Sequence, residues 1–371
     1  MGFRLGIGNI DIRNVRPFDW AAYWAARYPS ALSLTVISST QINLVWTNNG
    51  AVDYEGVSIE RSTDGITYAE IDTIVPGAAY SDTTCAANTL YYYRIRYYRG
   101  THYSAYSNVV SGTTWTAQYQ TVYDSFTTKP SAAIAAAQNT MVAALVAAGV
   151  WTKLDVLYIF AQTTNGAGEA LKNWKLPGTY DATLVNAPAF VALEGFTGAA
   201  TKYIRTNWNP NSNGVNYTLD SAFGAIYIRT NVKENSTDFG AKDATHFAAY
   251  LATRWISGVD GDLYGRINTS VASQIANTDS RGMFVISRET NNIVRVYRNK
   301  AQIIDAAVAS SVIPNKEMYI LCYNNNGVAD FLSTKQVSFY AAGAKLLQAD
   351  VNSLTDAFEV YMDSNGKGVI A

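Results

Sequence analysis

The sequence predicts an all-β protein made of two sandwich domains. The chain of 371 residues is about twice the length of an ordinary domain. From residue 31 to residue 115, short runs that alternate Val, Ile, Leu, Tyr and Thr with polar residues are separated by turn signals about every eight to twelve residues. Beyond residue 150, a longer series of such runs lacks the crossover helices that parallel strands need. Antiparallel sheets follow from these three observations.

The first predicted domain spans residues 31–115. Its strand-like runs include LSLTVIS, QINLVWTN, YEGVSIERS and ITYAEIDTI. The turn signals between them include Asp64-Gly65 and Pro76-Gly77, which favour the φ angles of tight turns. This rhythm is typical of a small antiparallel sandwich.

A family resemblance supports this interpretation. Trp46 ends an early strand, GVSIERSTDGITYAEI follows it, and NTLYYYRIRYY precedes SAYSNVVSGTT. This ordered set resembles a fibronectin type III domain. The resemblance implies that Trp46 lies in the core and that Tyr91, two residues after Thr89, forms a tyrosine corner. It implies a spacer-like or adhesive module and no particular reaction.

The second predicted domain spans residues 116–371 and opens with a helix at about 131–148. Pro130 is well placed to begin that helix and Gly149 to end it. The segments between the opening helix and the C-terminal end alternate as strands do. A last amphipathic stretch, at about 350–362, predicts a second flanking helix.

A second resemblance concerns this domain. The segments DVLYIFAQ, LKNWKLPGTYDATLVNAPAFVALEGFTG and KYIRTNWNP, and a later turn at Arg298-Asn299-Lys300, occur in an order that resembles the concanavalin A-like lectin or glucanase superfold of phage structural proteins. Many antiparallel strands without crossover helices also favour a two-sheet jelly roll.

Residues 1–30 fit neither domain by pattern. They are dense in aromatic side chains, including Trp20, Tyr23 and Trp24, which would expose a large apolar area without a partner. The segment resembles the N-terminal docking segments of some phage fibre and virion proteins. We therefore predict that it docks on other virion proteins, and that both domains fold without it.

Composition excludes several classes of partner. Charged residues make up 15% of the chain and the net charge is −1, without a basic stripe that could neutralise several phosphates, so nucleic acid is an unexpected partner. We expect no insertion into a membrane, because no window approaches about 18 apolar residues. Asp11 and Arg13 interrupt any export signal. Cys85 and Cys322 fall in different predicted domains, so we expect no disulfide between them.

Metal and catalytic motifs are missing from the sequence. His102 and His246 are far apart and have no Cys or carboxylates at ligand spacing, so we predict neither a metal nor another cofactor. A glucanase on a jelly roll needs two carboxylates that face each other, and no E-x-D-x-x-E run occurs. Glu359 and Asp363 come closest, but their spacing favours a solvated helix face. We predict that the protein is not an enzyme.

Two polar turns have a second interpretation. Asp260-Gly261-Asp262 could begin a calcium site, although a tight hairpin turn explains it better. Residues 324–327, Asn-Asn-Asn-Gly, are likewise interpreted first as a turn and second as a sugar-binding loop.

Sugar binding needs an aromatic platform with amide partners for hydroxyl groups. Trp174, Trp208 and Trp255 are the candidates for that platform. Trp208 stands out because the loop TNWNPNSNGVNY surrounds it with Asn207 and Asn209 and contains no strand pattern that demands burial. We predict Trp208, its two asparagine neighbours and Trp174 as ligand contacts.

These features together favour a structural virion protein of a tailed bacteriophage, a fibre or decoration subunit. It would be anchored by its N-terminal segment, present a lectin-like domain to a host surface or glycan, and form a homo-oligomer. It would be assembled in the host cytoplasm and exposed on the particle surface. The alternatives are a secreted glycan-binding accessory module and, less favoured, a glycoside hydrolase.

Overall fold

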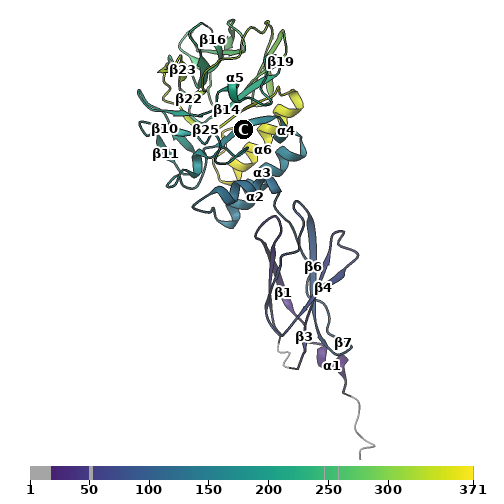
Figure 1. Ribbon diagram of the computed structural model, residues 1–371. Coiled ribbons are helices and arrows are strands. Elements are labelled where there is room, and N and C mark those ends of the chain that lie inside the picture. Colours follow the sequence, from purple (N-terminus) through teal and green to yellow (C-terminus); the bar gives the residue numbers. More distant parts are fainter. Residues whose placement is uncertain (1–17, 50–52, 246, 258, 371) are drawn as a thin grey trace, which may run out of the picture. The chain divides into compact units, whose positions relative to one another are not determined.

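The computed structural model describes residues 18–49, 53–245, 247–257 and 259–370. The chain divides into two compact units, Met1–Thr114 and Trp115–Ala371 (Figure 1). The predicted all-β class is confirmed, because antiparallel sheets form the core of both units. His246 and residues 1–17 of the predicted docking segment lie outside the described residues.

Unit 1 is a sandwich of two antiparallel sheets. The first sheet has the order β1-β2-β5, with β1 at Ser30–Val36, β2 at Ile42–Thr47 and β5 at Ala79–Asp82. The second has the order β4-β3-β6-β7, with β8 also paired to β6. Its strands are β3 (Gly56–Ser62), β4 (Ala69–Ile74), β6 (Leu90–Arg99), β7 (His102–Tyr103) and β8 (Val110–Thr113). This strand order is that of a fibronectin type III sandwich.

The core of unit 1 contains the two residues that the family resemblance identifies. Trp46 and Tyr91 are both buried between the sheets. The hydroxyl of Tyr91 accepts a hydrogen bond from the backbone N–H of Ala86 at 2.9 Å, which is the arrangement of a tyrosine corner. Further along β6, Tyr93 and Tyr97 alternate into the same core.

The described part of the N-terminal segment packs on unit 1, so the prediction that it fits neither domain is wrong there. Helix α1 (Trp20–Trp24) follows Asp19, whose carboxylate accepts the N–H of Ala22. Trp24 is buried against Tyr97 of the core, with 6.1 Å between the ring centroids. Trp20 and Trp24 are four residues apart, so their side chains lie on the same face of the helix and can pack together on unit 1. Removing residues 1–30 would therefore expose part of the unit 1 core.

Unit 2 is a larger sandwich of two sheets. One sheet has the order β10-β13-β22-β15-β16-β17-β18, with β23 paired to β15 and β24 paired to β23. Its strands are β10 (Thr183–Val185), β13 (Tyr203–Arg205), β15 (Phe239–Lys242), β16 (Phe247–Trp255), β17 (Asp262–Ile267), β18 (Ser273–Ala276), β22 (Tyr319–Ile320), β23 (Tyr323–Asn325) and β24 (Val328–Asp330). We call it the front sheet.

The other sheet, here the back sheet, has the order β11-β12-β25-β14-β19-β20-β21, with β9 also paired to β25. Its strands are β9 (Leu154–Ile159), β11 (Ala189–Val191), β12 (Gly195–Thr197), β14 (Ala222–Ile228), β19 (Gly282–Thr290), β20 (Ile293–Arg298), β21 (Ala301–Ala307) and β25 (Gln336–Gly343). Side chains from both sheets, such as Leu251, Leu263, Ile226 and Tyr340, form one core between them.

Helices cover the outer face of the back sheet (Figure 1). Helix α6 (Gln348–Ser364) places Phe358 against Tyr227 of β14 and Phe339 of β25, with ring centroids 5.0 and 4.9 Å apart. Helix α3 (Ala132–Ala147) packs beside α6. The remaining helical segments are α2 (Ala117–Ser125), α4 (Val150–Lys153), α5 (Pro210–Asn213) and the 3-10 turn η2 (Glu169–Leu171).

The opening helix agrees with its prediction, and two other helical segments differ from what the sequence predicted. The opening helix begins one residue after Ser131, whose hydroxyl accepts the N–H of Ile134 as its cap. The segment 117–125, for which no helix was predicted, forms helix α2, and the side chains of Tyr119 and Val122 are buried on one of its faces. Glu359 of the last helix is buried rather than solvated, since the Tyr227 hydroxyl donates to it at 2.6 Å.

The polar turns are hairpins. Asn326 and Gly327 have φ angles of +53° and +104° between β23 and β24. Gly261 has a φ of +92° between β16 and β17. Asn299 and Lys300 have φ angles of +48° and +75° between β20 and β21. These left-handed positions favour the Gly and Asn residues found at most of them.

Candidate functional site

The front sheet of unit 2 carries a cavity of about 370 Å³, within the range of small-molecule sites. Most of its lining side chains are aromatic, with one guanidinium and one hydroxyl added. The lining residues are Thr237, Tyr250, Trp255, Tyr264, Arg266, Tyr323 and Phe331. We call this the aromatic cavity.

Strand register explains why three of these side chains lie on one face. Tyr250 of β16 is paired with Arg266 of β17, and paired residues point to the same side of a sheet. Along β17, Tyr264 shares the face of Arg266, while Leu263 points the other way into the core. The outer face of the front sheet therefore presents Tyr250, Tyr264 and Arg266 together.

A β-bulge brings Trp255 to the same face. The register of β16 against β17 shifts between Ala252 and Trp255, so that Trp255 is paired with Asp262. Strict alternation would send Trp255 to the core side, because it is an odd number of positions from Tyr250. One extra residue in the strand reverses this direction. Trp255 packs edge-on to Tyr264 at 6.2 Å between centroids.

Phe331 and Tyr323 complete the aromatic wall. The Phe331 ring lies 5.1 Å from Trp255 and is stacked at 5.7 Å from Tyr323. The backbone of Phe331 is left-handed, with a φ of +49°, which costs about 1–3 kcal/mol for a bulky residue. Its carbonyl accepts the N–H of Thr237 at 2.9 Å, so the strained position is held from a neighbouring segment.

Buried ionic contacts fix the segment that follows Phe331. The Lys335 ammonium donates to Asp238 at 2.9 Å, and both side chains are fully buried. Glu234 accepts hydrogen bonds from the Ser333 hydroxyl at 2.7 Å and from the Thr334 backbone N–H at 3.0 Å. Removal of either partner of the buried pair would leave an uncompensated buried charge, which is strongly destabilising.

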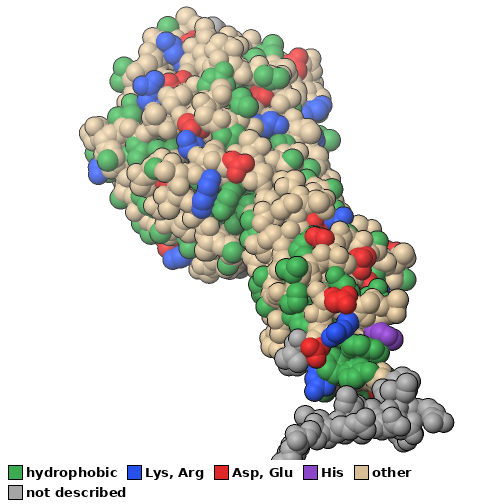
Figure 2. Space-filling view, turned by 60° about the horizontal axis from the view of Figure 1, so that its bottom comes forward, with side chains coloured by type: hydrophobic (Ala, Val, Ile, Leu, Met, Phe, Trp, Pro, Cys, Tyr) green, Lys and Arg blue, Asp and Glu red, His purple; other side chains and the backbone are tan. Residues whose placement is uncertain are grey.

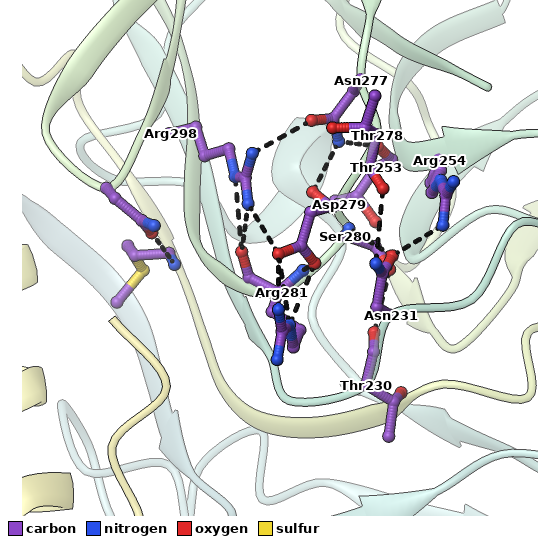
Figure 3. A network of polar contacts seen from close by, with 12 residues as sticks. Thr230, Asn231, Thr253, Arg254, Asn277, Thr278, Asp279, Ser280, Arg281 and Arg298 are labelled. Carbon is purple, nitrogen blue, oxygen red and sulfur yellow. Dashed lines mark hydrogen bonds and ion pairs between the residues drawn. The ribbon is translucent and has the colours of Figure 1, made fainter. Parts of the chain in front are cut away.

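A polar network holds the strand end that carries Trp255 (Figure 3). The Arg254 guanidinium donates to the Asn231 side chain at 2.9 Å and to the Asp260 carbonyl at 3.0 Å. The Asn277 amide donates to the Thr253 carbonyl at 2.5 Å. In the same network, Asp279 forms ion pairs with two arginines, Arg281 at 3.0 Å and Arg298 at 3.3 Å. The bulge is therefore positioned by contacts outside the cavity.

The electrostatics of the cavity combine one cation with neutral phenols. The Arg266 guanidinium lies over the Tyr250 ring, 5.3 Å from its centroid. Burial raises the pKa of Tyr250, against the opposing effect of Arg266. Burial, and then the Asp330 carboxylate, raises the pKa of Tyr323 to about 12. Near neutral pH both phenols are protonated, and Arg266 carries the positive charge.

The sequence-predicted ligand contacts lie elsewhere. Trp208 is fully buried in the core of unit 2 and packs edge-on to Tyr217 at 5.7 Å, so its prediction as an exposed platform is wrong. Its loop folds inward because the Asp155 carboxylate accepts backbone N–H groups from Val215, Asn216 and Tyr217.

The other predicted contacts also serve the fold. Asn207 donates to the Asp181 carbonyl at 2.7 Å, and Asn209 caps helix α5 through the N–H of Asn211. Trp174 is buried, and its neighbours include Tyr119 of the unpredicted helix α2, at 6.2 Å between centroids. Of the three tryptophan candidates, Trp255 lines the aromatic cavity and the other two do not.

Within the predicted docking segment, Trp24 is a core residue and unavailable to a partner. Trp20 and Tyr23 are partly buried, and Trp20 stacks on His102 at 5.1 Å. In the part of the chain that the structure describes, no group of three His, Cys, Asp or Glu side chains could hold a metal ion. Its helices include none long and apolar enough to cross a membrane. Charged side chains are scattered singly over the face drawn in Figure 2.

Comparison with known proteins finds similarity to fibronectin type III domains among solved structures. A Fn3-like protein from Clostridium thermocellum is 27% identical over 23% of this chain and 91% of its own, with a TM-score of 0.21. The sixth fibronectin type III domain of a human protein containing such domains is 19% identical over 24% of this chain and 85% of its own (TM-score 0.22). A domain of Drosophila Lar is 17% identical over 23% and 92% (TM-score 0.20). No family model and no curated protein matches the chain.

Proposed function

We propose that this chain is a surface-attachment protein that binds a carbohydrate in the aromatic cavity of unit 2. The observation that carries the proposal is the convergence of Trp255, Tyr264 and Phe331 on one cavity that also contains protonated phenols and a guanidinium. Aromatic rings pack against the apolar face of a sugar ring, and the polar groups bond its hydroxyls. The cavity has the volume for a ligand of this size.

The architecture of unit 2 supports the same proposal. Its two sheets, antiparallel apart from the β15–β23 pair, enclose one core, and the described connections between neighbouring strands are consistent with a jelly roll. We assign it to the concanavalin A-like lectins and glucanases on this basis and on its sequence resemblance. The chain acts by binding rather than by hydrolysis, since a hydrolase needs two carboxylates beside the sugar. The described lining residues of the cavity include no carboxylate.

We also propose that the chain is a tailed-phage virion protein, a fibre or decoration subunit. In this proposal unit 1 is a spacer, the N-terminal segment with Trp20 and Tyr23 contacts other virion proteins, and unit 2 attaches to a host surface. Assembly takes place in the host cytoplasm. Several copies of the chain in a homo-oligomer would turn weak single-site binding into firm attachment.

Mass spectrometry of purified particles tests the virion part of the proposal. Phage particles from a lysate should contain the chain at a fixed ratio to the major capsid protein. A secreted glycan-binding accessory module would bind the same sugars but would stay in the medium when particles are pelleted. The chain's absence from particles would contradict the virion assignment and leave the carbohydrate site to be judged separately.

A glycan array and whole-cell binding with the full chain test the carbohydrate site. We expect specific binding, reduced at least about fivefold in Trp255→Ala, since an aromatic contact contributes about 1 kcal/mol beyond its buried area. Leu176→Ala is the matched control because Leu176 is 53% exposed and does not line the cavity. Equal binding by the Trp255→Ala variant would contradict the assigned site.

A further inference from the structure

We propose that the aromatic cavity selects a sugar that bears a carboxylate, such as a uronic acid, and that Arg266 binds this carboxylate. The inference deepens the proposed function and rests on it. It concerns the class of sugar, which aromatic stacking alone does not decide, because neutral and acidic sugars present similar apolar faces.

The charges around the cavity favour an anion. Among the described lining residues, Arg266 is positively charged and none is acidic. Two carboxylates near the cavity already accept hydrogen bonds from protein groups, and that of Asp330 lies close enough to the Tyr323 phenol of the lining to raise its pKa. Asp330 accepts from the Asn325 amide at 3.1 Å and from the Phe331 backbone N–H at 2.9 Å. Asp262 accepts from the Ser257 hydroxyl at 2.6 Å. Among the described lining residues, a bound carboxylate would therefore find a cation and no like charge.

The position of Arg266 suits a planar carboxylate. It is fixed by the β17 register opposite Tyr250, and its guanidinium lies over that ring. A guanidinium presents parallel N–H donors that match the two oxygens of a carboxylate, which a hydroxyl cannot match. The aromatic walls keep the local dielectric constant low and strengthen the ion pair relative to one in water.

The remaining lining groups complement the rest of such a ligand. Trp255 and Phe331 offer apolar surface to the ring, and the protonated hydroxyl of Tyr250 can donate to a ring hydroxyl or to the second carboxylate oxygen. A chain with a net charge of −1 has no general attraction for anions. Preference for an acidic sugar would thus arise from the cavity itself.

Calorimetric titration of the full chain tests the inference. The ligands are methyl glucuronide, methyl glucoside and a sulfated glucoside. We expect the glucuronide to bind at least about tenfold more tightly than the glucoside, which is the contribution of one hydrogen bond to a charged group, and to weaken as salt rises. Preference for the sulfated sugar, or equal binding of the acidic and neutral sugars, would overturn the carboxylate assignment.

Variants assign the preference to Arg266. Arg266→Gln should bring the two affinities to within about twofold while the glucoside still binds, and Arg266→Lys should recover only part of the preference because it lacks the paired donors. Arg205→Gln is the charge-matched control, since Arg205 lies on the same sheet, pairs with Glu317 and does not line the cavity. Circular dichroism checks that each variant is folded.

The outcomes separate this inference from the proposed function. If both sugars bind equally and both lose affinity in Trp255→Ala, the cavity binds carbohydrate but does not select an acid. If no sugar binds the folded full chain, the carbohydrate proposal itself fails. If glucuronide preference survives unchanged in folded Arg266→Gln, another group binds the carboxylate and the inference is wrong.

Discussion

The two sheets of unit 2 use their outer faces in opposite ways. On the back sheet, outward side chains such as Tyr227 and Phe339 are buried beneath Phe358 of helix α6. On the front sheet, Tyr250, Tyr264 and Arg266 are only partly buried and line a cavity. The aromatic face of the back sheet is covered by the chain's own helix, while that of the front sheet leaves space for a ligand. The aromatic content of a sheet face therefore does not by itself identify a binding site; the face must also be left uncovered by the protein's own helices.

The largest expected effect is on the covered face. Phe358→Ala should destabilise unit 2 by about 3–5 kcal/mol, because it removes a buried ring between helix and sheet. Trp255→Ala, on the open face, should cost much less stability while reducing sugar binding. Thermal and denaturant unfolding of both variants measure the difference. Equal destabilisation by the two substitutions would show that the outer faces of the two sheets are not used differently.

The next effect concerns the buried pair behind the cavity. Lys335→Met leaves Asp238 buried without its cation and should destabilise unit 2 by about 3–5 kcal/mol. The double variant Lys335→Met with Asp238→Asn should recover part of that loss, since no unpaired charge is left. Sugar binding should weaken in the single variant because the pair fixes the segment that follows Phe331. Denaturant titration of wild type and the two variants measures this recovery of stability; a double variant no more stable than the single one would contradict this account.

A smaller effect is expected at high pH. Since the pKa of Tyr323 is raised from 10.0 to about 12 in the folded protein, the folded state binds the phenolic proton more tightly than the unfolded state does. The associated stability is fully present below pH 10 and is lost as pH rises from 10 through about 12. Tyr323→Phe should show a shallower loss over this window in denaturant titrations. An unchanged slope would mean that Tyr323 does not contribute.

The smallest effect separates the phenols from the rings. Tyr264→Phe keeps the contact with Trp255 and should change sugar affinity by no more than about fivefold, the value of one neutral hydrogen bond. Tyr264→Ala removes the ring as well and should lose more. Titration of both variants with the same sugar checks the order. A larger loss in Tyr264→Phe than in Trp255→Ala would show that hydroxyl contacts, and not stacking, dominate.

Sequence reasoning was sufficient for features that follow from local pattern. Alternation and turn residues predicted the all-β class. The family resemblance implied a tyrosine corner at Tyr91, whose hydroxyl accepts the backbone N–H of Ala86. Sequence reasoning was insufficient where contacts between residues far apart in the sequence determine whether a side chain is buried. Nothing local in the loop around Trp208 indicates that Asp155, more than fifty residues earlier in the chain, draws that loop inward.

The cavity illustrates the same limit. Its residues come from β16, β17, β23, the turn after β24 and the segment before β15, and a bulge reverses the face of Trp255. A simple count from Tyr250 would place Trp255 on the core side. The odd spacing between two aromatic residues in a strand of alternating pattern is a signal that could have suggested a bulge, although its location needs the partner strand.

The most direct test of the carbohydrate site is a fluorescence titration of the full chain and its Trp255→Phe variant with a sugar that binds on the array. We predict a saturable change in tryptophan emission in the wild type that is lost in the variant, while the variant still binds because phenylalanine retains an aromatic face. The same emission change in both proteins would place the sugar away from Trp255 and contradict the account of the open face.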